Sequence, residues 1–231
     1  MRVGVLLAPR DGAVPPSAAA VVIDVLRATS TLSAARAHGA ARILPAASPE
    51  EAAALRRQHP GALLCGERES LKIPGFDLGN SPLEYDPARV AGRTLIFCST
   101  NGSRALVSAS RARRRLLGAF VNARAVIEAL EGEREVMVVC AGNRGAPSLE
   151  DAACAGLLCE RLERRGAVVG GGAARLARSL APRDAAEVQA VVQGSAHGRE
   201  LRALGARYAA DVEWCAELDR LGGADAIELG G

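Results

Sequence analysis

Apolar segments alternate with helix-like segments along the first 165 residues, with polar residues, Gly and Pro between them. Short apolar runs rich in β-branched residues predict strands. We predict strands at 1–7, 21–26, 41–44, 62–65, 93–98, 116–121 and 135–140. Helices are predicted at 32–39, 48–58, from 104 onward, at 123–130 and at 148–165. This alternation favours an α/β fold, in which helices cover both faces of a layered, mainly parallel or mixed sheet.

The pattern changes at about residue 173, where strand signals end and helical ones follow one another. Helices are predicted at 173–180, 185–193, 197–204 and 208–221, with breaks at Pro182 and Gly194. A chain of 231 residues can build one large domain or two small ones. We expect a single α/β domain over residues 1–231, in which the part from about 173 could form a helical lobe.

Asp24 interrupts the buried strand at 21–26 near its end. A carboxylate there costs free energy unless a cation or hydrogen-bond donors meet it. Arg27 and three hydroxyl residues, 29–31, follow before the helix. Free N–H groups at a helix start suit an anion and Asp24 suits a metal ion, which together would serve phosphate chemistry with Mg²⁺. The plainer alternative is a turn with a helix cap.

Two further polar turns follow strands, at residues 99–103 and 141–145. Ligands of open parallel sheets bind outside the carboxyl ends of the strands, so we expect these turns to converge with Asp24. The segment 66–87 is longer and less regular than an ordinary connection, which favours a binding loop, with a solvated Ω-loop as the alternative. Its chemically informative residues are Glu67, Arg68, Glu69, Lys72, Asp77, Asn80 and Ser81.

Composition narrows the function classes. The net charge is only +3, aromatic residues are scarce and the basic residues are dispersed, which argues against a nucleic-acid partner. No apolar run reaches transmembrane length and no signal peptide is evident, so we expect a cytoplasmic protein without a membrane partner. The six Cys residues show no C-x-x-C or metal-finger spacing and lie mostly in apolar runs, which favours reduced thiols.

Cys98 and Arg104 match C-x₅-R, the phosphate-binding loop of cysteine phosphatases, in which a thiolate attacks phosphorus. The pattern is short, and a thiol at the end of an apolar strand is ordinary in a core. A phosphate-binding turn at 99–104 does not need the thiol. The two-carboxylate phosphatase signature D-x-D-x-T fails at Asp24, because Leu26 stands where the second Asp is required.

Five acidic residues are candidate ligands for a hard cation: Asp24, Glu67, Asp77, Glu150 and Asp151. Mg²⁺ usually takes only one or two carboxylates and completes its shell with water and phosphate oxygens. The last two acids have a second interpretation, because Ser148 can cap the helix that follows with Asp151 at the capping-box position. A lone His, such as His197, is more often structural than catalytic.

The chain carries VIDVLRATST at 22–31, GER at 66–68, GFDLGNSP at 75–82, TNG at 100–102, SLED at 148–151 and SAHG at 195–198. In this order the motifs resemble those of the 2-phosphosulfolactate phosphatase family over nearly the whole chain. The resemblance implies an α/β, Mg²⁺-dependent hydrolase that removes phosphate from (2R)-2-phospho-3-sulfolactate, yielding 3-sulfolactate in coenzyme M biosynthesis. Two departures are Glu69-Ser70, where the family tends to have Gly-Gly, and Cys98-Ser99, in a turn that is usually Thr-rich.

The functional residues that we predict join these two lines of reasoning. The catalytic candidates are Asp24, Arg27, Asn101 and Asp77. The substrate-binding candidates are Thr29, Ser30, Thr31, Arg68, Lys72, Asn80, Ser81, Ser99, Thr100, Gly102, Ser103 and Arg144. The candidate Mg²⁺ ligands are Asp24, Glu67, Asp77 and Asp151. The expected partner is a small anionic phosphate ester, and self-association stays open. A cysteine phosphatase that uses Cys98 and a phosphoanion-binding module without turnover are the alternatives.

Overall fold

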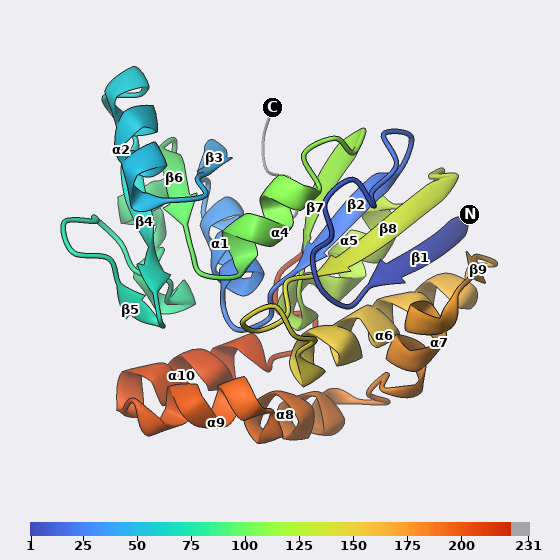
Figure 1. Ribbon diagram of the computed structural model, residues 1–231. Coiled ribbons are helices and arrows are strands. Elements are labelled where there is room, and N and C mark those ends of the chain that lie inside the picture. The colour runs from blue at the N-terminus through green and yellow to red at the C-terminus, as the bar shows by residue number, and fades with distance from the viewer. Residues whose placement is uncertain (223–231) are drawn as a thin grey trace.

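The structure, a computed structural model, describes residues 1–222, which form two β-sheets (Figure 1). The larger sheet contains β1 (Arg2–Leu6), β2 (Ala19–Ile23), β7 (Arg114–Gly118), β8 (Glu135–Cys140) and β9 (Val168–Val169). These strands are parallel and lie in the order β7-β2-β8-β1-β9. The smaller sheet contains β3 (Arg42–Pro45), β4 (Leu63–Arg68), β5 (Leu71–Lys72) and β6 (Thr94–Cys98). Its order is β3-β6-β4-β5, and β5 pairs antiparallel with β4.

Helices cover both faces of the larger sheet. The helices before residue 165 are α1 (Ala28–Ala37), α2 (Pro49–Gln58), α3 (Pro87–Val90), α4 (Gly102–Ser108), α5 (Ala123–Ala129) and α6 (Leu149–Glu163), with 3₁₀ turns η1 (Pro82–Glu84) and η2 (Phe120–Asn122). Of these, α2 packs on β4 and β6 of the smaller sheet. Helices α5 and α6 pack on one face, and α1 and α4 lie between the two sheets (Figure 1). The expected α/β class is confirmed, with the strands divided between two sheets.

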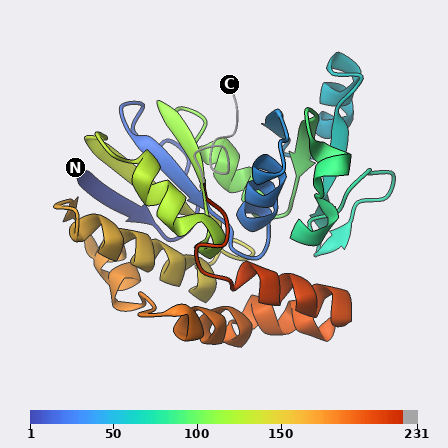
Figure 2. The same ribbon diagram turned by 180° about the vertical axis from the view of Figure 1, so that it is seen from behind.

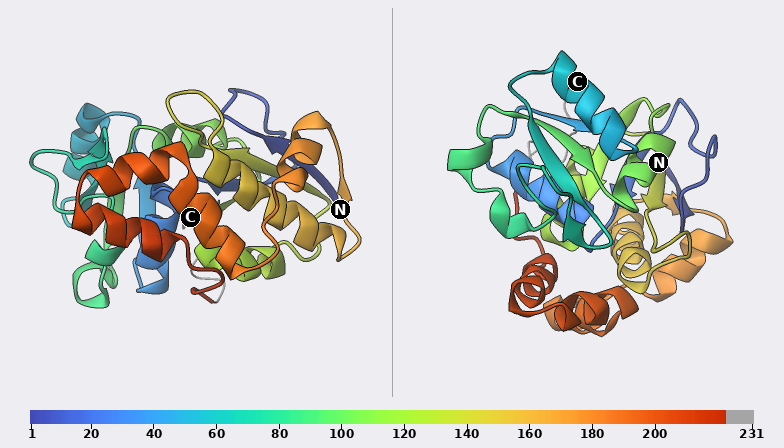
Figure 3. Two further views of the ribbon diagram at one scale, coloured as in Figure 1. Left: turned by 90° about the horizontal axis from the view of Figure 1, so that it is seen from below. Right: turned by 60° about the vertical axis from the view of Figure 1, so that its left-hand side comes forward.

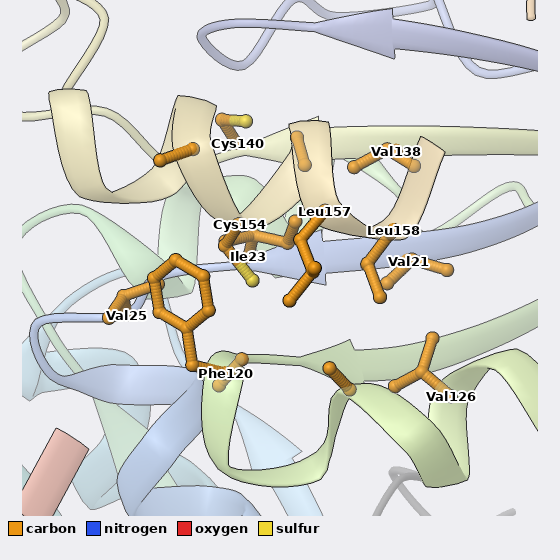
Figure 4. Packing of buried hydrophobic residues seen from close by; sticks show 14 of the residues in the cluster. Val21, Ile23, Val25, Phe120, Val126, Val138, Cys140, Cys154, Leu157 and Leu158 are labelled. Carbon is orange, nitrogen blue, oxygen red and sulfur yellow. The ribbon is translucent and has the colours of Figure 1, made fainter. Parts of the chain in front are cut away.

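The central strand β2 is buried along its whole length. Successive residues of a strand point to opposite faces. Val21 and Ile23 therefore enter the core under α5 and α6, where they pack near Phe120 and Leu157 (Figure 4). Val22 points the other way, into the core shared with the smaller sheet. Burial on both faces explains why the strand reads as a continuous apolar run.

The C-terminal part of the described chain is helical, as predicted. It consists of α7 (Gly172–Ser179), α8 (Ala185–Gly194), α9 (Ala196–Ala203) and α10 (Ala206–Cys215). Helix α7 packs against α6, and the other three form a layer below both sheets in Figure 1, also seen from behind in Figure 2. Seen from below, this layer crosses from the larger sheet to the smaller one (Figure 3). The last helix ends at Cys215, earlier than predicted.

Three local predictions are corrected by the structure. Residues 28–31, expected as a polar turn, form the first turn of α1, because the chain leaves β2 and turns over residues 24–27. The strand expected at 116–121 ends at Gly118, where the buried residues that follow enter η2. Strand β4 continues to Arg68, inside the segment expected to be irregular, because β6 and β5 pair with it there.

Two findings bear on the expectations from composition. Within residues 1–222, no helix has the combination of length and apolar character needed to traverse a bilayer. The six Cys side chains are free and buried, in agreement with reduced thiols. The division of the chain into domains stays a prediction.

Gly66 allows β4 to approach β6 closely. Its backbone has φ +136°, a region that side chains other than glycine rarely adopt. A Cβ atom at this position would lie 1.8 Å from the carbonyl oxygen of Cys98. Because that oxygen belongs to the backbone of the neighbouring strand, the clash cannot be relieved by rotating a side chain.

We expect Gly66→Ala to lower the free energy of unfolding by at least about 2 kcal/mol, since the added methyl group must displace the backbone of β6. Urea denaturation followed by circular dichroism measures the change. Gly61→Ala is the matched control, because a Cβ there meets open space and the backbone lies outside the left-handed region. Equal stability of the two variants would contradict the prediction.

Candidate active site

A cavity of about 250 Å³ lies where the carboxyl ends of β2, β4, β6 and β8 meet helix α9. The predicted residues in its wall are Asp24, Arg27, Glu67, Asn80, Thr100, Asn101 and Arg144. The wall also contains residues that were not predicted: Leu26, Glu69, Ser70, Asn143, His197 and Glu200. The three polar turns after strands therefore converge, as their positions in the sequence indicated.

Asp24 follows β2 directly and faces the start of α1. Its Oδ1 accepts the backbone N–H of Ala28 at 3.2 Å. Its Oδ2 has no hydrogen-bond partner within residues 1–222 and lies against Gly102, where a Cβ atom would come within 2.7 Å of it. The residue is only 6% exposed. One carboxylate oxygen is therefore left for a ligand, and the missing side chain of Gly102 leaves room beside it.

The electrostatics of the cavity favour a bound cation. Burial, together with the carboxylates of Glu67 and Glu150, raises the pKa of Asp24 to about 7, although the Ala28 N–H and Arg27 act in the opposite direction. Burial also raises the pKa of Glu150. Several carboxylates thus lie in or beside one cavity of about 250 Å³, and positive charge there would stabilise their ionised forms.

Glu67, at the end of β4, ties two turns together. Its Oε1 accepts the backbone N–H of Thr100 at 2.7 Å, and its Oε2 accepts the backbone N–H of Ser70 at 2.7 Å. The Thr100 hydroxyl donates a further bond of 3.2 Å to Oε2. Each carboxylate oxygen has two lone pairs, so Glu67 can hold these turns and still face a cation.

Arg27 extends from the start of α1 to the C-terminal helices. Its Nη1 lies 2.5 Å from Oδ2 of Asp211, in a pair whose side chains are 3% and 0% exposed. Its Nη2 donates to the carbonyl of Ser70 at 2.8 Å, and the guanidinium lies 5.1 Å from the centre of the Tyr208 ring. The charge of Arg27 is therefore largely matched within the protein.

The turns after β6 and β8 are joined by two asparagines. Nδ2 of Asn101 donates to Oδ1 of Asn143 at 3.4 Å, and the backbone N–H of Arg144 donates to Oδ1 of Asn101 at 3.1 Å. Arg144 has φ +51° and an exposed side chain, whose guanidinium contacts no carboxylate within residues 1–222. Of the two arginines in the described wall, Arg27 is paired and Arg144 is free to meet a ligand.

Asn80 supplies a polar group without a partner. Its Oδ1 is buried and accepts no hydrogen bond in the described part of the chain. Its backbone carbonyl accepts the hydroxyl of Thr31 at 3.2 Å, which fixes the loop before η1. Buried carbonyl oxygens are rarely left unpaired, so this one fits a cation or a donor group of a bound ligand.

Helix α9 contributes two residues that sequence reasoning did not assign, His197 and Glu200. Nδ1 of His197 lies 3.7 Å from Oε1 of Glu150. Burial lowers the pKa of His197. The available signal was the SAHG motif at 195–198, in which Ser195 caps the helix by accepting the Gly198 N–H. A helical pattern gives no sign that its first turn faces the ends of distant strands.

The hydroxyl cradle expected after β2 is not formed. The hydroxyl of Thr29 donates to the carbonyl of Gly118 at 2.7 Å, and that of Ser30 donates to the carbonyl of Val25 at 2.8 Å. The hydroxyl of Thr31 is likewise bound to a backbone carbonyl. All three side chains are buried and hold the turn in place, so they lie outside the cavity.

The turn after β6 places two of its predicted residues, Thr100 and Asn101, in the wall. The hydroxyl of Ser103 accepts the Ser99 N–H at 2.8 Å, and that of Ser99 accepts the Ser103 N–H at 3.0 Å. These two residues therefore fix the turn and do not face a ligand. Gly102 packs behind Asp24, where its role is to leave space.

Lys72, Asp77 and Ser81 line a separate cavity beside η1 and α10. Oδ2 of Asp77 accepts the backbone N–H of Leu64 at 2.8 Å and lies 2.9 Å from Nη1 of Arg56. Asp77 thus holds its loop against β4. The catalytic and metal-binding roles predicted for Asp77, and the substrate contact predicted for Lys72, do not agree with these positions.

Asp151 is also placed differently from its predicted role as a metal ligand. Its Oδ1 accepts the backbone N–H of Val25 at 2.8 Å, and its Oδ2 accepts that of Gly142 at 2.9 Å. It braces the turns after β2 and β8 and lies outside the cavity wall. The predicted capping box is absent, because the Ser148 side chain accepts no N–H of α6.

Cys98 lies in the core and outside the cavity wall. Burial raises the pKa of its thiol, which disfavours a reactive thiolate. Arg68, a predicted substrate-binding residue outside the C-x₅-R match, contacts Cys98. Its Nη2 lies 3.4 Å from Sγ of Cys98 and 3.2 Å from the carbonyl oxygen of Ala47, so Arg68 also faces away from the cavity. The C-x₅-R match therefore has no counterpart in the geometry.

The pKa of Asp24 gives a prediction for stability. The folded chain favours the protonated Asp24 carboxyl. The contribution of this group to the free energy of unfolding is therefore greatest below its unfolded pKa of 3.8, and it is lost as the pH rises through about 7. The shift corresponds to at most about 4 kcal/mol. In EDTA at pH 8, Asp24→Asn should therefore be more stable than the wild type, and at pH 4 the two should converge.

Thermal melts at both pH values measure this difference. Asp11→Asn is the control, because Asp11 lies exposed in a loop. A variant no more stable than the wild type at pH 8 would show that the Asp24 carboxylate is not strained by its surroundings.

Comparison with known proteins assigns the family. The chain matches the family model described as 2-phosphosulpholactate phosphatase over residues 8–223. It is similar to three proteins named probable 2-phosphosulfolactate phosphatase. That of Carboxydothermus hydrogenoformans is 41% identical over 96% of this chain and 91% of its own length. The protein of Thermotoga petrophila is 39% identical over 87% of this chain and 85% of its own length. The protein of Deinococcus radiodurans is 41% identical over 86% of this chain and 83% of its own length. The chain therefore belongs to the 2-phosphosulfolactate phosphatase family.

Proposed function

We propose that the protein hydrolyses (2R)-2-phospho-3-sulfolactate, or a closely similar small anionic phosphate ester, to 3-sulfolactate and inorganic phosphate. The observation that carries this proposal is the match to the family over residues 8–223. The cavity supports it, because about 250 Å³ suits a small metabolite and the wall contains oxygen and nitrogen groups suited to a phosphate ester.

A divalent cation, Mg²⁺, is part of the proposal, and the residues present fit it. Within residues 1–222 no group of three His, Cys, Asp or Glu side chains is arranged to hold a metal ion alone. Mg²⁺ suits such a site, because it keeps waters and substrate oxygens in its shell. Asp24, through its unpaired Oδ2, and Glu67 would hold the ion, which supplies positive charge to the phosphoryl oxygens.

The chain's own polar groups would orient the substrate. Thr100 and Asn101 lie beside the proposed cation ligands, at the end of β6. Arg27 stays in place beside them because Asp211 and Ser70 hold it. Arg144 offers an unpaired guanidinium at the rim, and its planar fork matches a carboxylate or sulfonate group. We therefore assign Arg144 to the end of the substrate that carries no phosphate.

Of the two alternatives weighed from the sequence, the cysteine phosphatase loses support. A cysteine phosphatase needs a reactive thiolate in the cavity, whereas Cys98 is buried outside it. A binding module without turnover would hold phosphate with the same turns but would release no product. A cytoplasmic location and self-association stay predictions from the sequence.

Removal of divalent cations tests the function. After exhaustive EDTA treatment, turnover of 2-phosphosulfolactate should fall at least about 100-fold and return when Mg²⁺ is added, since charge on the phosphoryl group is then neutralised again. Released inorganic phosphate is the readout. Cys98→Ala is the control and should keep activity within about tenfold.

Full activity in the metal-free protein, or a trapped phosphocysteine, would overturn the proposed chemistry. Binding of phosphate without turnover under all conditions would favour the binding module.

Arg144→Gln should lower kcat/KM for 2-phosphosulfolactate by about tenfold or more, because a charge-assisted contact to the substrate is lost. The loss should be smaller for 2-phospholactate, which lacks the sulfonate, if Arg144 meets that group. Steady-state kinetics on both substrates give the comparison. Arg175→Gln, exposed on α7, is the control. Unchanged kinetics for both substrates would remove Arg144 from the site.

A further inference from the structure

Hydrolysis of a phosphate monoester is accelerated by a group that takes a proton from the attacking water. Four carboxylates belong to the cavity wall. Glu69 and Glu200 are exposed residues, and the two buried ones, Asp24 and Glu67, have other roles in the proposed function. Glu67 accepts two backbone N–H groups, and Asp24 lends its free oxygen to the cation. Asn101, Thr100 and the arginines in the wall are poor proton acceptors at neutral pH.

His197 is placed to accept this proton. It lies in the first turn of α9, and its side chain is part of the cavity wall although only 14% of it is exposed. The other two histidines of the chain lie elsewhere: the ring of His38 bonds the carbonyl of Tyr85, and His59 ends α2. Imidazole is the side chain whose ordinary pKa best suits proton transfer near neutral pH.

Glu150 is the carboxylate next to Nδ1 of His197. Its Oε1 lies 3.7 Å from Nδ1, a separation that one small adjustment on ligand binding would turn into a hydrogen bond. With Nδ1 turned to Glu150, Nε2 is the nitrogen left for the cavity. Glu150 is 2% exposed and comes from the first turn of α6, so a rigid element supports the contact.

The charged groups around His197 come from several elements: Glu150 on α6, Glu200 on α9, Glu67 on β4, and Arg27 and Arg144 at the strand ends. Burial lowers the pKa of His197, which favours the neutral ring. A neutral ring can accept a proton, and the Glu150 carboxylate stabilises the cation that forms.

We propose that His197 is the general base of the reaction and that Glu150 is its positioning residue. The proposal rests on the proposed monoester hydrolysis. As the oxygen of water forms its bond to phosphorus, one water proton passes to Nε2 of His197. The ester P–O bond breaks, its electron pair leaves with the ester oxygen, and that oxygen takes a proton from solvent. His197 then returns its proton to solvent.

The experiment compares wild type, His197→Gly and His197→Gln on 4-nitrophenyl phosphate and on 2-phosphosulfolactate, both with Mg²⁺. Each variant should lose about 100-fold or more in kcat on both esters, with KM within threefold. Gln keeps much of the size of the side chain, so loss in both variants does not come from an emptied volume, and circular dichroism checks that both variants fold. His59→Ala is the matched control and should keep wild-type kinetics.

Two further readouts separate proton transfer from a structural role. Added imidazoles should restore His197→Gly, and the restored rate should rise with the pKa of the imidazole used. Glu150→Gln should lower kcat in the wild type but have no further effect in His197→Gly, because a positioning residue acts only through the ring that it holds.

The proposal is overturned if the His197 variants keep kcat within threefold, or if the restored rate is independent of imidazole pKa. A loss confined to 2-phosphosulfolactate would also overturn it, because His197 would then donate to a poor leaving group instead of activating water. If the wild type hydrolyses 4-nitrophenyl phosphate but not 2-phosphosulfolactate, the substrate assignment fails, and the His197 comparison is decided on the aryl ester alone.

Discussion

The buried ion pair between Arg27 and Asp211 is the contact on which the arrangement of the site depends. It joins the start of α1, which belongs to the sheet core, to α10, which belongs to the C-terminal layer. Asp211 also accepts the hydroxyl of Ser81 at 2.5 Å, and Arg27 donates to the carbonyl of Ser70. Loss of either charged partner would leave the other buried and uncompensated, which typically costs 3–5 kcal/mol.

This pair has a consequence for the neighbouring acids. Because Asp211 matches the charge of Arg27, that arginine compensates Asp24, Glu67 and Glu150 only weakly, and Asp24 keeps a raised pKa. The excess of negative charge creates a demand for a cation at the place where the phosphate would bind. Asp24, whose ionised form is disfavoured in the empty cavity, would then hold the metal, so stability and function are opposed at this residue.

The cavity itself is a product of two sheets that end at the same place. Asp151 accepts backbone N–H groups after β2 and β8, and Glu67, at the end of β4, accepts a backbone N–H group after β6. Each buried carboxylate therefore connects the ends of two strands. Helices α8, α9 and α10 lie below both sheets (Figure 1). Helix α9 contributes His197 to the cavity wall. Residues from widely separated parts of the chain thus meet in a space of about 250 Å³.

The sequence alone was enough to predict the α/β class, most of the strands and helices, the special position of Asp24 and the convergence of the polar turns. These follow from local patterns: period-two and apolar runs define strands, and a polar residue at the end of a buried strand costs free energy unless it has a use. Motif resemblance extended the prediction to the family, which the comparison confirmed.

What each side chain contacts was decided only by the tertiary structure. The chemistry of three predicted residues suits the site, but their positions do not. Asp77 and Asp151 accept backbone N–H groups, and Lys72 lines a second cavity. His197 looked structural, yet α9 carries it to the strand ends. The physical reason is that a carboxylate or imidazole is equally suited to a brace, a cap or a ligand. Its role is therefore set by which donors and charges the fold brings within hydrogen-bond distance, and no local pattern contains that information.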